Sequence, residues 1–171
     1  RMEIRIDSSD PFNQVGEILT KGMNVMDGYY NNPEASNTVL SPDGWLHTGD
    51  LGVLDPDGYL YIKGRSKSLI LGPSGQNIYP EEIEDLLNAQ PYIAESLVIE
   101  REGKLVALVY PDAEAMKQNK ISRETLLKII HETRKQINQQ LPAYSQIARI
   151  EIHDEEFEKT PKRSIKRFLY Q

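Results

Sequence analysis

The stretch His47-Thr48-Gly49-Asp50 holds residue types that suit a binding site for a sugar. Glycine lets the backbone approach a ligand closely, and a carboxylate accepts hydrogen bonds from two neighbouring hydroxyls of a ribose. Dinucleotide sites use an acidic residue on ribose for the same reason. A plain turn capped by Asp50 also explains the segment, because Asp and Gly are common in turns. The four residues alone leave both interpretations open.

A basic cluster, Gly64-Arg65-Ser66-Lys67, follows about fifteen residues later. Arg65 offers a fork of hydrogen-bond donors that suits an anion or sugar oxygens. Lys67 stands where one region of the chain gives way to the next, and hinges consist of a few residues that absorb a large φ/ψ change. The alternative is a solvated basic turn without a ligand.

The segment Gly72–Asn77 (GPSGQN) precedes a predicted helix. Two glycines and a proline in this position can form an anion-binding helix N-terminus. The segment lacks the Gly-Lys-Ser/Thr of a Walker phosphate loop, so it is only a weak candidate for a phosphate-binding loop. A hairpin tip or a loop explains the composition as well.

The last chemical candidate is a basic segment near residue 160. A lysine there could neutralise the charge that develops on a phosphoryl group. A solvated tail or a nonspecific contact with nucleic acid are the alternatives. Its basic residues are Lys159, Lys162, Arg163, Lys166 and Arg167.

Composition excludes several classes of protein. The chain has no cysteine, so disulfides and thiolate zinc sites are impossible, and a reducing cytoplasm is the expected compartment. His47, His131 and His153 lack metal-ligand spacing, and we expect no protein-ligated metal. The net charge of −6 argues against a protein that binds nucleic acid over its whole surface. No apolar run reaches the roughly 18 residues of a membrane span, and none resembles a signal peptide.

Periodicity predicts an α+β fold in two regions. A β-rich region with a short helix starting at residue 33 comes first, followed by a small α+β domain of about 100 residues. The first region is too small to bury a good core alone, so it resembles the end of something larger. The expected strands are 15–19, 51–54, 59–63, 96–100, 104–110 and 147–152, and the expected longer helices are 80–88 and 123–140.

Taken in order, these segments resemble the C-terminal part of the adenylate-forming (AMP-forming) acyl-CoA synthetases. The resemblance covers nearly the whole chain, and its strength lies in the joint order and spacing of the pieces. The matching segments are Gly16–Leu19, Gly28–Tyr30 with Asn32–Glu34, Asp43–Asp50, Asp57–Leu60, Gly64–Lys67 and Gly75–Glu84.

The resemblance implies a role for each candidate site. Residues 1–65 would be the C-terminal end of the large nucleotide-binding domain, with Thr48, Asp50 and Arg65 at the nucleotide and Asp50 on the ribose hydroxyls. Residues 66–171 would be the mobile C-terminal α+β domain, turning about Lys67 between two half-reactions.

The same resemblance assigns the glycine-rich loop to the second half-reaction. Gly72, Gly75 and Gln76 would help to line the channel for the pantetheine arm of CoA. ATP, Mg²⁺ and CoA would be substrates or activator of the full-length enzyme.

The tail departs from the family pattern, which is roughly Lys-Thr-x-x-Gly-Lys-Ile-x-Arg. When Ile165 is aligned, Ser164 occupies the position of the catalytic lysine and Arg163 replaces the glycine. Lys162 or Lys166 would then have to reach the reaction from a shifted backbone, or adenylation is weak.

The expected function is therefore part of an ATP-dependent ligase that makes acyl-AMP and then acyl-CoA, from a long-chain fatty acid by family likeness. The family's phosphate loop and acyl pocket are not found, so we expect a missing N-terminal domain and no activity of the chain alone. An adenylating enzyme that loads an amino or aryl acid onto a carrier-protein thiol, a non-catalytic remnant lid, and a nucleic-acid contact through the tail are the alternatives. No specific nucleic-acid partner is expected.

Overall fold

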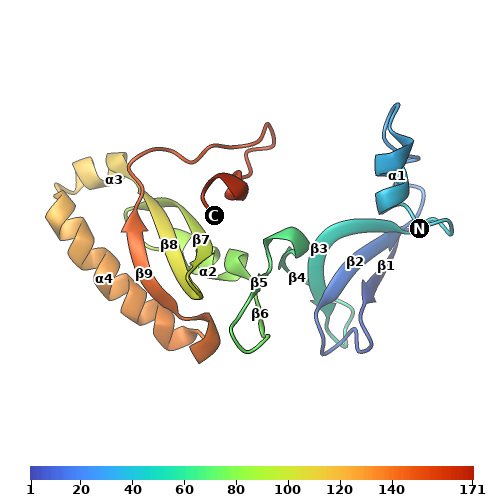
Figure 1. The fold of residues 1–171 in the computed structure, drawn as a ribbon, viewed down its shortest axis with the longest axis horizontal. Coiled ribbons are helices and arrows are strands. Elements are labelled where there is room, and N and C mark those ends of the chain that lie inside the picture. The colour runs from blue at the N-terminus through green and yellow to red at the C-terminus, as the bar shows by residue number, and fades with distance from the viewer. The chain divides into compact units, whose positions relative to one another are not determined.

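The computed structural model describes all 171 residues, and they form two compact units, Arg1–Lys67 and Ser68–Gln171. Each unit has a sheet of its own, shown in blue to teal for the first and in yellow to orange for the second (Figure 1). The boundary falls inside a short 3₁₀ helix, Ser66–Ser68. None of the helices combines the length and apolar character that crossing a bilayer requires.

The first unit is a four-stranded antiparallel sheet in the order β1-β2-β3-β4. Its strands are β1 (Glu3–Asp7), β2 (Gly16–Lys21), β3 (Leu46–Leu54) and β4 (Leu60–Arg65), and α1 (Pro33–Val39) lies between β2 and β3 in the chain. The predicted turn between the last two strands is present, because the Asp55 carboxylate accepts hydrogen bonds from the amides of Asp57 and Tyr59.

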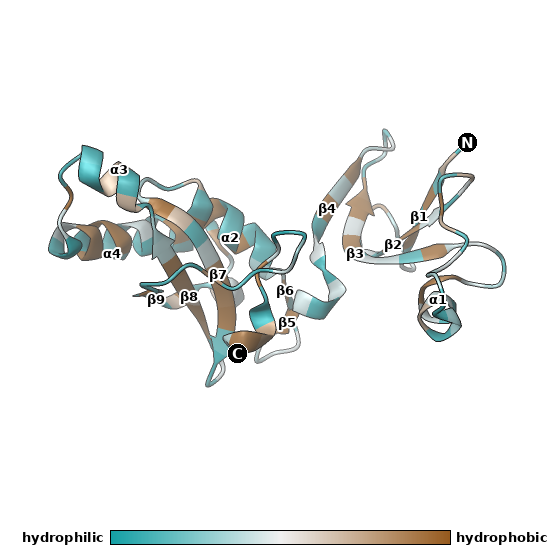
Figure 2. Cartoon of the chain, turned by 90° about the horizontal axis from the view of Figure 1, so that it is seen from above, coloured by the Kyte–Doolittle hydropathy of each residue, from teal (hydrophilic) through white to brown (hydrophobic).

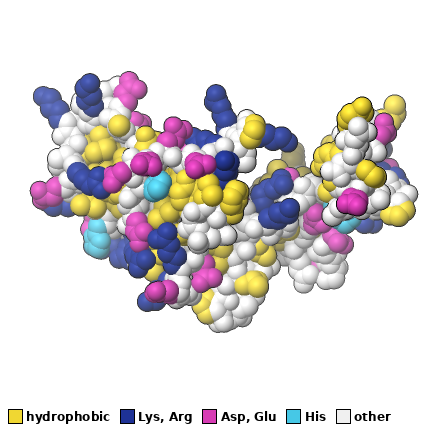
Figure 3. Space-filling model, turned by 45° about the horizontal axis from the view of Figure 1, so that its top comes forward, with side chains coloured by type: hydrophobic (Ala, Val, Ile, Leu, Met, Phe, Trp, Pro, Cys, Tyr) yellow, Lys and Arg dark blue, Asp and Glu magenta, His cyan; other side chains and the backbone are white.

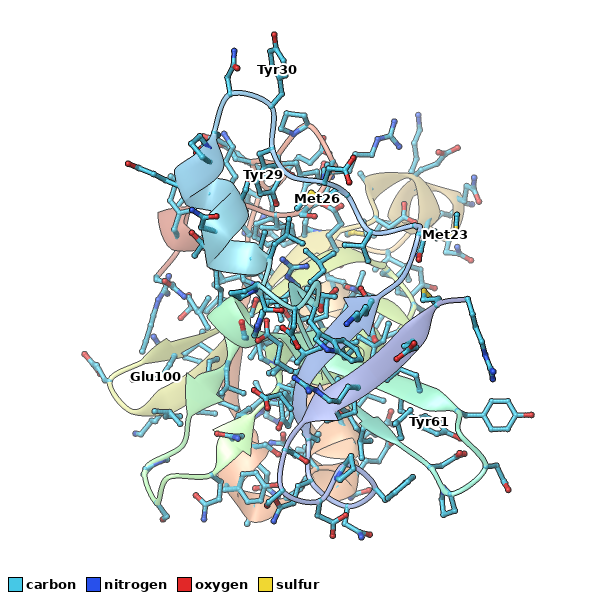
Figure 4. The ribbon with its side chains drawn as sticks, turned by 90° about the vertical axis from the view of Figure 1, so that its right-hand side faces the viewer. Met23, Met26, Tyr29, Tyr30, Tyr61 and Glu100 are labelled. Carbon is cyan, nitrogen blue, oxygen red and sulfur yellow. The ribbon has the colours of Figure 1, made fainter.

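Few apolar side chains of this first unit are fully buried. Its buried apolar residues are Ile6, Ile18 and Leu19. In contrast, Met23 is 98% exposed and Tyr30 is 94% exposed, and Figure 4 shows both standing away from the ribbon on the chain between β2 and α1.

The second unit contains a three-stranded sheet in the order β7-β8-β9. The strands β7 (Ile93–Arg101) and β8 (Lys104–Pro111) form an antiparallel hairpin, and β9 (Ile147–Ile152) runs parallel to β8. A parallel pair requires a crossover, which α3 (Ala113–Gln118) and α4 (Arg123–Gln140) supply. The remaining elements are α2 (Pro80–Asn88) and a small hairpin of β5 (Ile70–Leu71) and β6 (Asn77–Ile78).

Both faces of the β7–β8 hairpin are buried. One face, with Val98 and Ala107, packs against the apolar sides of α2 and α4. The opposite face, with Leu97 and Val106, packs against Phe157 from the C-terminal segment. The two strands are consequently apolar along most of their length, as their brown colour in Figure 2 shows.

The helices α2 and α4 have the bounds that the sequence predicts. Ser122 caps α4, since its side chain accepts a hydrogen bond from the amide of Thr125, and proline opens α2. The sequence did not predict β1 or α3. It also left the C-terminal segment as a basic tail, whereas this segment folds back from β9 towards β7 and α2 (Figure 1, red), because Phe157 and its apolar neighbours cover the second face of the sheet.

Phe157 offers a test of this second core. Phe157 is 2% exposed, so Phe157→Ala should lower the free energy of unfolding by about 3–5 kcal/mol, through lost burial and the cavity left behind. Urea denaturation of the 171-residue chain measures this change.

Phe168 is the matched control, because it lies in the same segment and is 71% exposed. Phe168→Ala should change the unfolding free energy by less than about 0.5 kcal/mol. Equal effects of the two substitutions would show that the C-terminal segment does not pack on the sheet.

Candidate functional site

The segment Thr48-Gly49-Asp50 is a bulge inside β3, so the plain turn that the sequence left open is not formed. The strands β2 and β3 pair on both sides of it, and their register shifts next to Ile18. Gly49 has a φ of +72°, a left-handed conformation that glycine adopts at little cost. The bulge therefore interrupts the ladder locally without ending the strand.

Two side chains hold the bulge in shape. The Thr48 hydroxyl donates to the carbonyl of Ile18 at 2.8 Å and accepts from the amide of Asp50 at 3.0 Å. The Glu17 carboxylate accepts from the amide of Gly49 at 2.9 Å and lies 2.9 Å from Nδ1 of His47. Backbone groups that the bulge removes from the ladder thus regain partners.

Glu17 is the site residue that the sequence analysis missed. It was recognised only as part of a family segment, and its function depends on a neighbour across the sheet. A charged residue within the otherwise apolar strand VGEIL was the one available signal. The Thr48 hydroxyl uses its donor and one acceptor position for contacts within the bulge, and these contacts position Asp50. A contact between Thr48 and a nucleotide stays a prediction.

The bulge places Asp50 directly opposite Arg65 on β4. The Arg65 guanidinium Nη1 donates to Asp50 Oδ1 at 2.6 Å. The side chain of Asp50 is 34% exposed and that of Arg65 is 57% exposed. A Cβ added at Gly49 would lie 3.5 Å from Nη2 of Arg65, an ordinary van der Waals contact, so the left-handed φ rather than lack of space favours glycine here.

This exposed pair can bind a polar ligand. Only Oδ1 of Asp50 is engaged within the chain, which leaves Oδ2 as an acceptor and the remaining Arg65 donors for a ligand with neighbouring hydroxyls. An exposed ion pair contributes only about 0–1 kcal/mol to stability, so the fold does not require the pair. Asp50 and Arg65, which the family resemblance assigns to a nucleotide, therefore lie side by side.

The predicted hinge residue and channel loop lie at two turns. Lys67 is exposed and lies in the 3₁₀ helix at the unit boundary. Gly72 and Gly75 form the tip of the β5–β6 hairpin, where the Gly72 amide donates to the Gln76 carbonyl at 2.8 Å. This tip lines a cavity of about 390 Å³ in the second unit, shared with Tyr144. Gln76 Oε1 is buried and has no hydrogen-bond partner.

The basic segment forms a hairpin, which we call the tail hairpin (residues 158–166). Lys159 pairs with Ile165, and the Thr160 amide donates to the Ser164 carbonyl at 2.8 Å. Arg163 has a φ of +63°, so the backbone keeps a left-handed turn at the position where the resembled family has glycine. Ser164 is exposed beside this turn.

The lysines of the tail hairpin differ in their pairing. Hydrogen bonds to Glu156 and then to Glu95 raise the pKa of Lys159, which lies 2.6 and 2.7 Å from their carboxylates. Lys166 lies 3.1 Å from the carboxylate of Glu158. Lys162 is exposed at the tip and forms no ion pair, so of the two predicted catalytic lysines it alone has an unengaged ammonium group.

No three His, Asp or Glu side chains are arranged to hold a metal ion. On the face shown in Figure 3, Lys and Arg side chains alternate with Asp and Glu and form no continuous basic patch. The nucleic-acid alternative accordingly gains no support from this face.

Comparison with known proteins identifies related sequences. Residues 67–170 match the family described as AMP-binding enzyme C-terminal domain. Indoleacetate–CoA ligase of Aromatoleum aromaticum is 50% identical over 98 residues, covering 55% of this chain and 19% of that protein. A 2-succinylbenzoate–CoA ligase of Bacillus cereus is 41% identical over 117 residues, covering 68% of this chain and 24% of that protein. The chain thus spans about a fifth to a quarter of these relatives' length.

Solved structures share the fold. The O-succinylbenzoate coenzyme A synthetase of Bacillus subtilis in complex with AMP superposes with a TM-score of 0.75 at 29% identity, over 99% of this chain and 33% of that chain. The α+β fold class is confirmed. The expected long-chain fatty acid is not supported, because the named relatives act on indoleacetate and succinylbenzoate.

Glu17 provides a test of the bulge. Glu17→Ala removes the acceptor for the Gly49 amide and the partner of His47, so the unfolding free energy should fall by about 1–3 kcal/mol. The Gly49 amide should also exchange faster with solvent. Urea denaturation and hydrogen exchange of the 171-residue chain measure the two effects.

Glu3→Ala is the control, since Glu3 is an exposed glutamate on β1 of the same sheet. It should leave both quantities unchanged. A Gly49 amide that stays equally protected in Glu17→Ala would show that the bulge does not depend on this carboxylate.

Proposed function

The chain belongs to the AMP-binding enzyme C-terminal domain family, and on that premise we propose that it is part of an ATP-dependent, AMP-forming acid–CoA ligase. The chain supplies the edge of the nucleotide site and the C-terminal lid. Residues 1–65 complete the large domain, and residues 66–171 form the mobile one.

The Asp50–Arg65 pair is the observation that supports this proposal most directly. Asp50 Oδ2 and the remaining Arg65 donors are available for the 2′- and 3′-hydroxyls of the AMP ribose. The relative with the same fold from Bacillus subtilis is described with AMP in one structure and with ATP and a magnesium ion in another. A nucleotide therefore fits both the hydrogen-bonding groups of the Asp50–Arg65 pair and the ligands described for the Bacillus subtilis relative.

The reaction would proceed in two half-reactions. The carboxylate oxygen of the acid attacks the α-phosphorus of ATP, forming acyl-AMP and releasing pyrophosphate. The CoA thiol then loses its proton and attacks the acyl carbon, forming the thioester and releasing AMP. Mg²⁺ on the phosphates would neutralise part of the charge that the departing pyrophosphate carries.

Lys67 would let one lid serve both half-reactions. Its position in an exposed 3₁₀ turn at the boundary of two compact units suits a residue that absorbs a change in φ/ψ. After rotation, the β5–β6 tip with Gly72, Gly75 and Gln76 would line the passage for the pantetheine arm of CoA. The buried and unpaired Gln76 Oε1 gives this tip an acceptor for an amide of that arm.

Lys162 would supply the positive charge for adenylation in place of the family lysine, whose position Ser164 occupies. It stands at the tip of the tail hairpin with its ammonium group unpaired, whereas Lys166 is held by Glu158. Because Arg163 preserves the left-handed turn, a lysine two positions before Ser164 remains on the same exposed tip. A cation there would stabilise the charge on the α-phosphoryl group.

Assay of the full-length protein tests the function. With ATP, Mg²⁺ and CoA, at least one acid of a panel of indole-3-acetate, 2-succinylbenzoate, benzoate and palmitate should yield acyl-CoA, AMP and pyrophosphate in equal amounts. Activity on palmitate alone would indicate that the substrate is a long-chain fatty acid. Transfer to a carrier-protein thiol without transfer to CoA would favour the carrier-loading alternative. The 171-residue chain by itself should form no acyl-CoA.

Asp50→Ala should abolish this activity in the full-length protein, whereas Asp57→Ala, in the exposed turn between β3 and β4, should not change it. Release of ADP in place of AMP, or activity that survives Asp50→Ala, would contradict the proposal.

The cation of the tail hairpin can be tested in the full-length protein. Lys162→Ala should slow acid-dependent ATP–pyrophosphate exchange by about 100-fold, the effect of removing one electrostatic group from a phosphoryl or acyl transfer site. Lys128→Ala, which removes an exposed lysine of α4, should have no effect.

Ser164→Lys separates this proposal from a remnant lid. If Lys162 already serves, the exchange rate should rise by less than about 3-fold. A large gain would show that the natural site is impaired, and a loss in Lys166→Ala without a loss in Lys162→Ala would assign the cation to Lys166.

A further inference from the structure

The backbone of Val98 lies on the open edge of the sheet, where β7 has no neighbouring strand. Its amide donates to Glu84 Oε1 at 2.6 Å, and its carbonyl accepts from Arg167 Nη1 at 3.2 Å. Arg167 Nη2 donates to Glu84 Oε2 at 2.5 Å, which closes a ring of hydrogen bonds. The two side chains thus complete an edge that would otherwise expose a donor and an acceptor.

This pair is far more buried than the other Arg–carboxylate pairs of the unit. The side chains of Glu84 and Arg167 are 10% and 19% exposed, whereas those of Arg123 and Asp154 are 63% and 62% exposed. Burial raises the pKa of Glu84, and the guanidinium of Arg167 opposes that rise. Removal of either partner would leave the other charge buried without compensation.

Arg167 directly follows the tail hairpin. The preceding residue, Lys166, closes the base of the hairpin, because its amide donates to the Glu158 carbonyl at 2.8 Å. The other strand of the hairpin is attached through the Glu158 amide, which donates to the Tyr170 hydroxyl at 2.8 Å. The guanidinium therefore ties the base of the hairpin to α2 and β7, and the Lys159–Glu95 ion pair is a second, more exposed charged link to β7.

We infer that Arg167, together with Glu84, is a positioning residue for adenylation, an inference that rests on the proposed function. The pair fixes the base of the tail hairpin and thereby the location of the Lys162 ammonium group at its tip. A group misplaced by about 1 Å can cost on the order of 100-fold in rate. In the proposed cycle, the thioester step would use the β5–β6 tip and would not need the tail hairpin.

Half-reactions of the full-length protein test this inference. Arg167→Gln should slow ATP–pyrophosphate exchange by about 10- to 100-fold. Thioester formation from preformed acyl-AMP and CoA should slow by less than about 3-fold. Arg167→Lys should be intermediate, because an ammonium group cannot donate to Glu84 and Val98 with the geometry of a guanidinium.

Arg123→Gln is the matched control, since it removes an exposed Arg–carboxylate pair from the same unit and should change neither half-reaction. Hydrogen exchange of the 171-residue chain supplies a readout that is independent of activity. In Arg167→Gln, the amides of Thr160 and Lys166 should lose protection, while that of Ala107 in β8 keeps it.

An equal loss in both half-reactions, or loss of protection throughout β8, would show a purely structural role and overturn the inference. Unchanged protection of the Thr160 and Lys166 amides would overturn it as well. A wild-type protein without any acid-dependent exchange would refute the proposed function, and the hydrogen-exchange readout would still decide whether Arg167 anchors the hairpin.

Discussion

The unpaired edge of β7 is the constraint on which the second unit depends. A sheet edge leaves backbone donors and acceptors open, and at Val98 these groups are completed by Glu84 from α2 and by Arg167 from the far end of the unit. The same contact that ends the sheet therefore joins three segments distant in sequence. A carboxylate and a guanidinium can be buried here because each has several partners.

In the first unit, side chains also provide hydrogen-bond partners for backbone groups that the sheet leaves unpaired. The bulge at Thr48–Asp50 takes backbone groups out of the ladder, and Thr48 and Glu17 return hydrogen-bond partners to them. The irregular backbone places Asp50 opposite Arg65, while β3 pairs with β2 on both sides of the bulge and with β4 from Asp50 onwards. Rigid strands on both sides thus fix an exposed polar pair, which is the arrangement that binding a polar ligand requires.

Local signals in the sequence were sufficient for the helices α2 and α4 and for the candidate residues Asp50 and Arg65. Proline at Pro80 and the cap at Ser122 mark helix starts through contacts within a few residues, so α2 and α4 were predicted with their bounds. The bulge, the contribution of Glu17 and the parallel pairing of β9 depend on partners far along the chain. The fold of the C-terminal segment likewise depends on a sheet face that no local pattern reveals.

The order of the elements along the chain has a consequence for biosynthesis. The β7–β8 hairpin is apolar on both faces and is complete by Pro111, but its parallel neighbour and its second cover, which includes Phe157, are translated later. During that interval the nascent hairpin exposes hydrophobic surface and an unpaired strand edge, as sheets with non-local strand pairing do while they are incomplete. Chaperone capture on the ribosome would be concentrated on this interval, and changes in translation speed between residues 111 and 157 would alter the yield of folded protein.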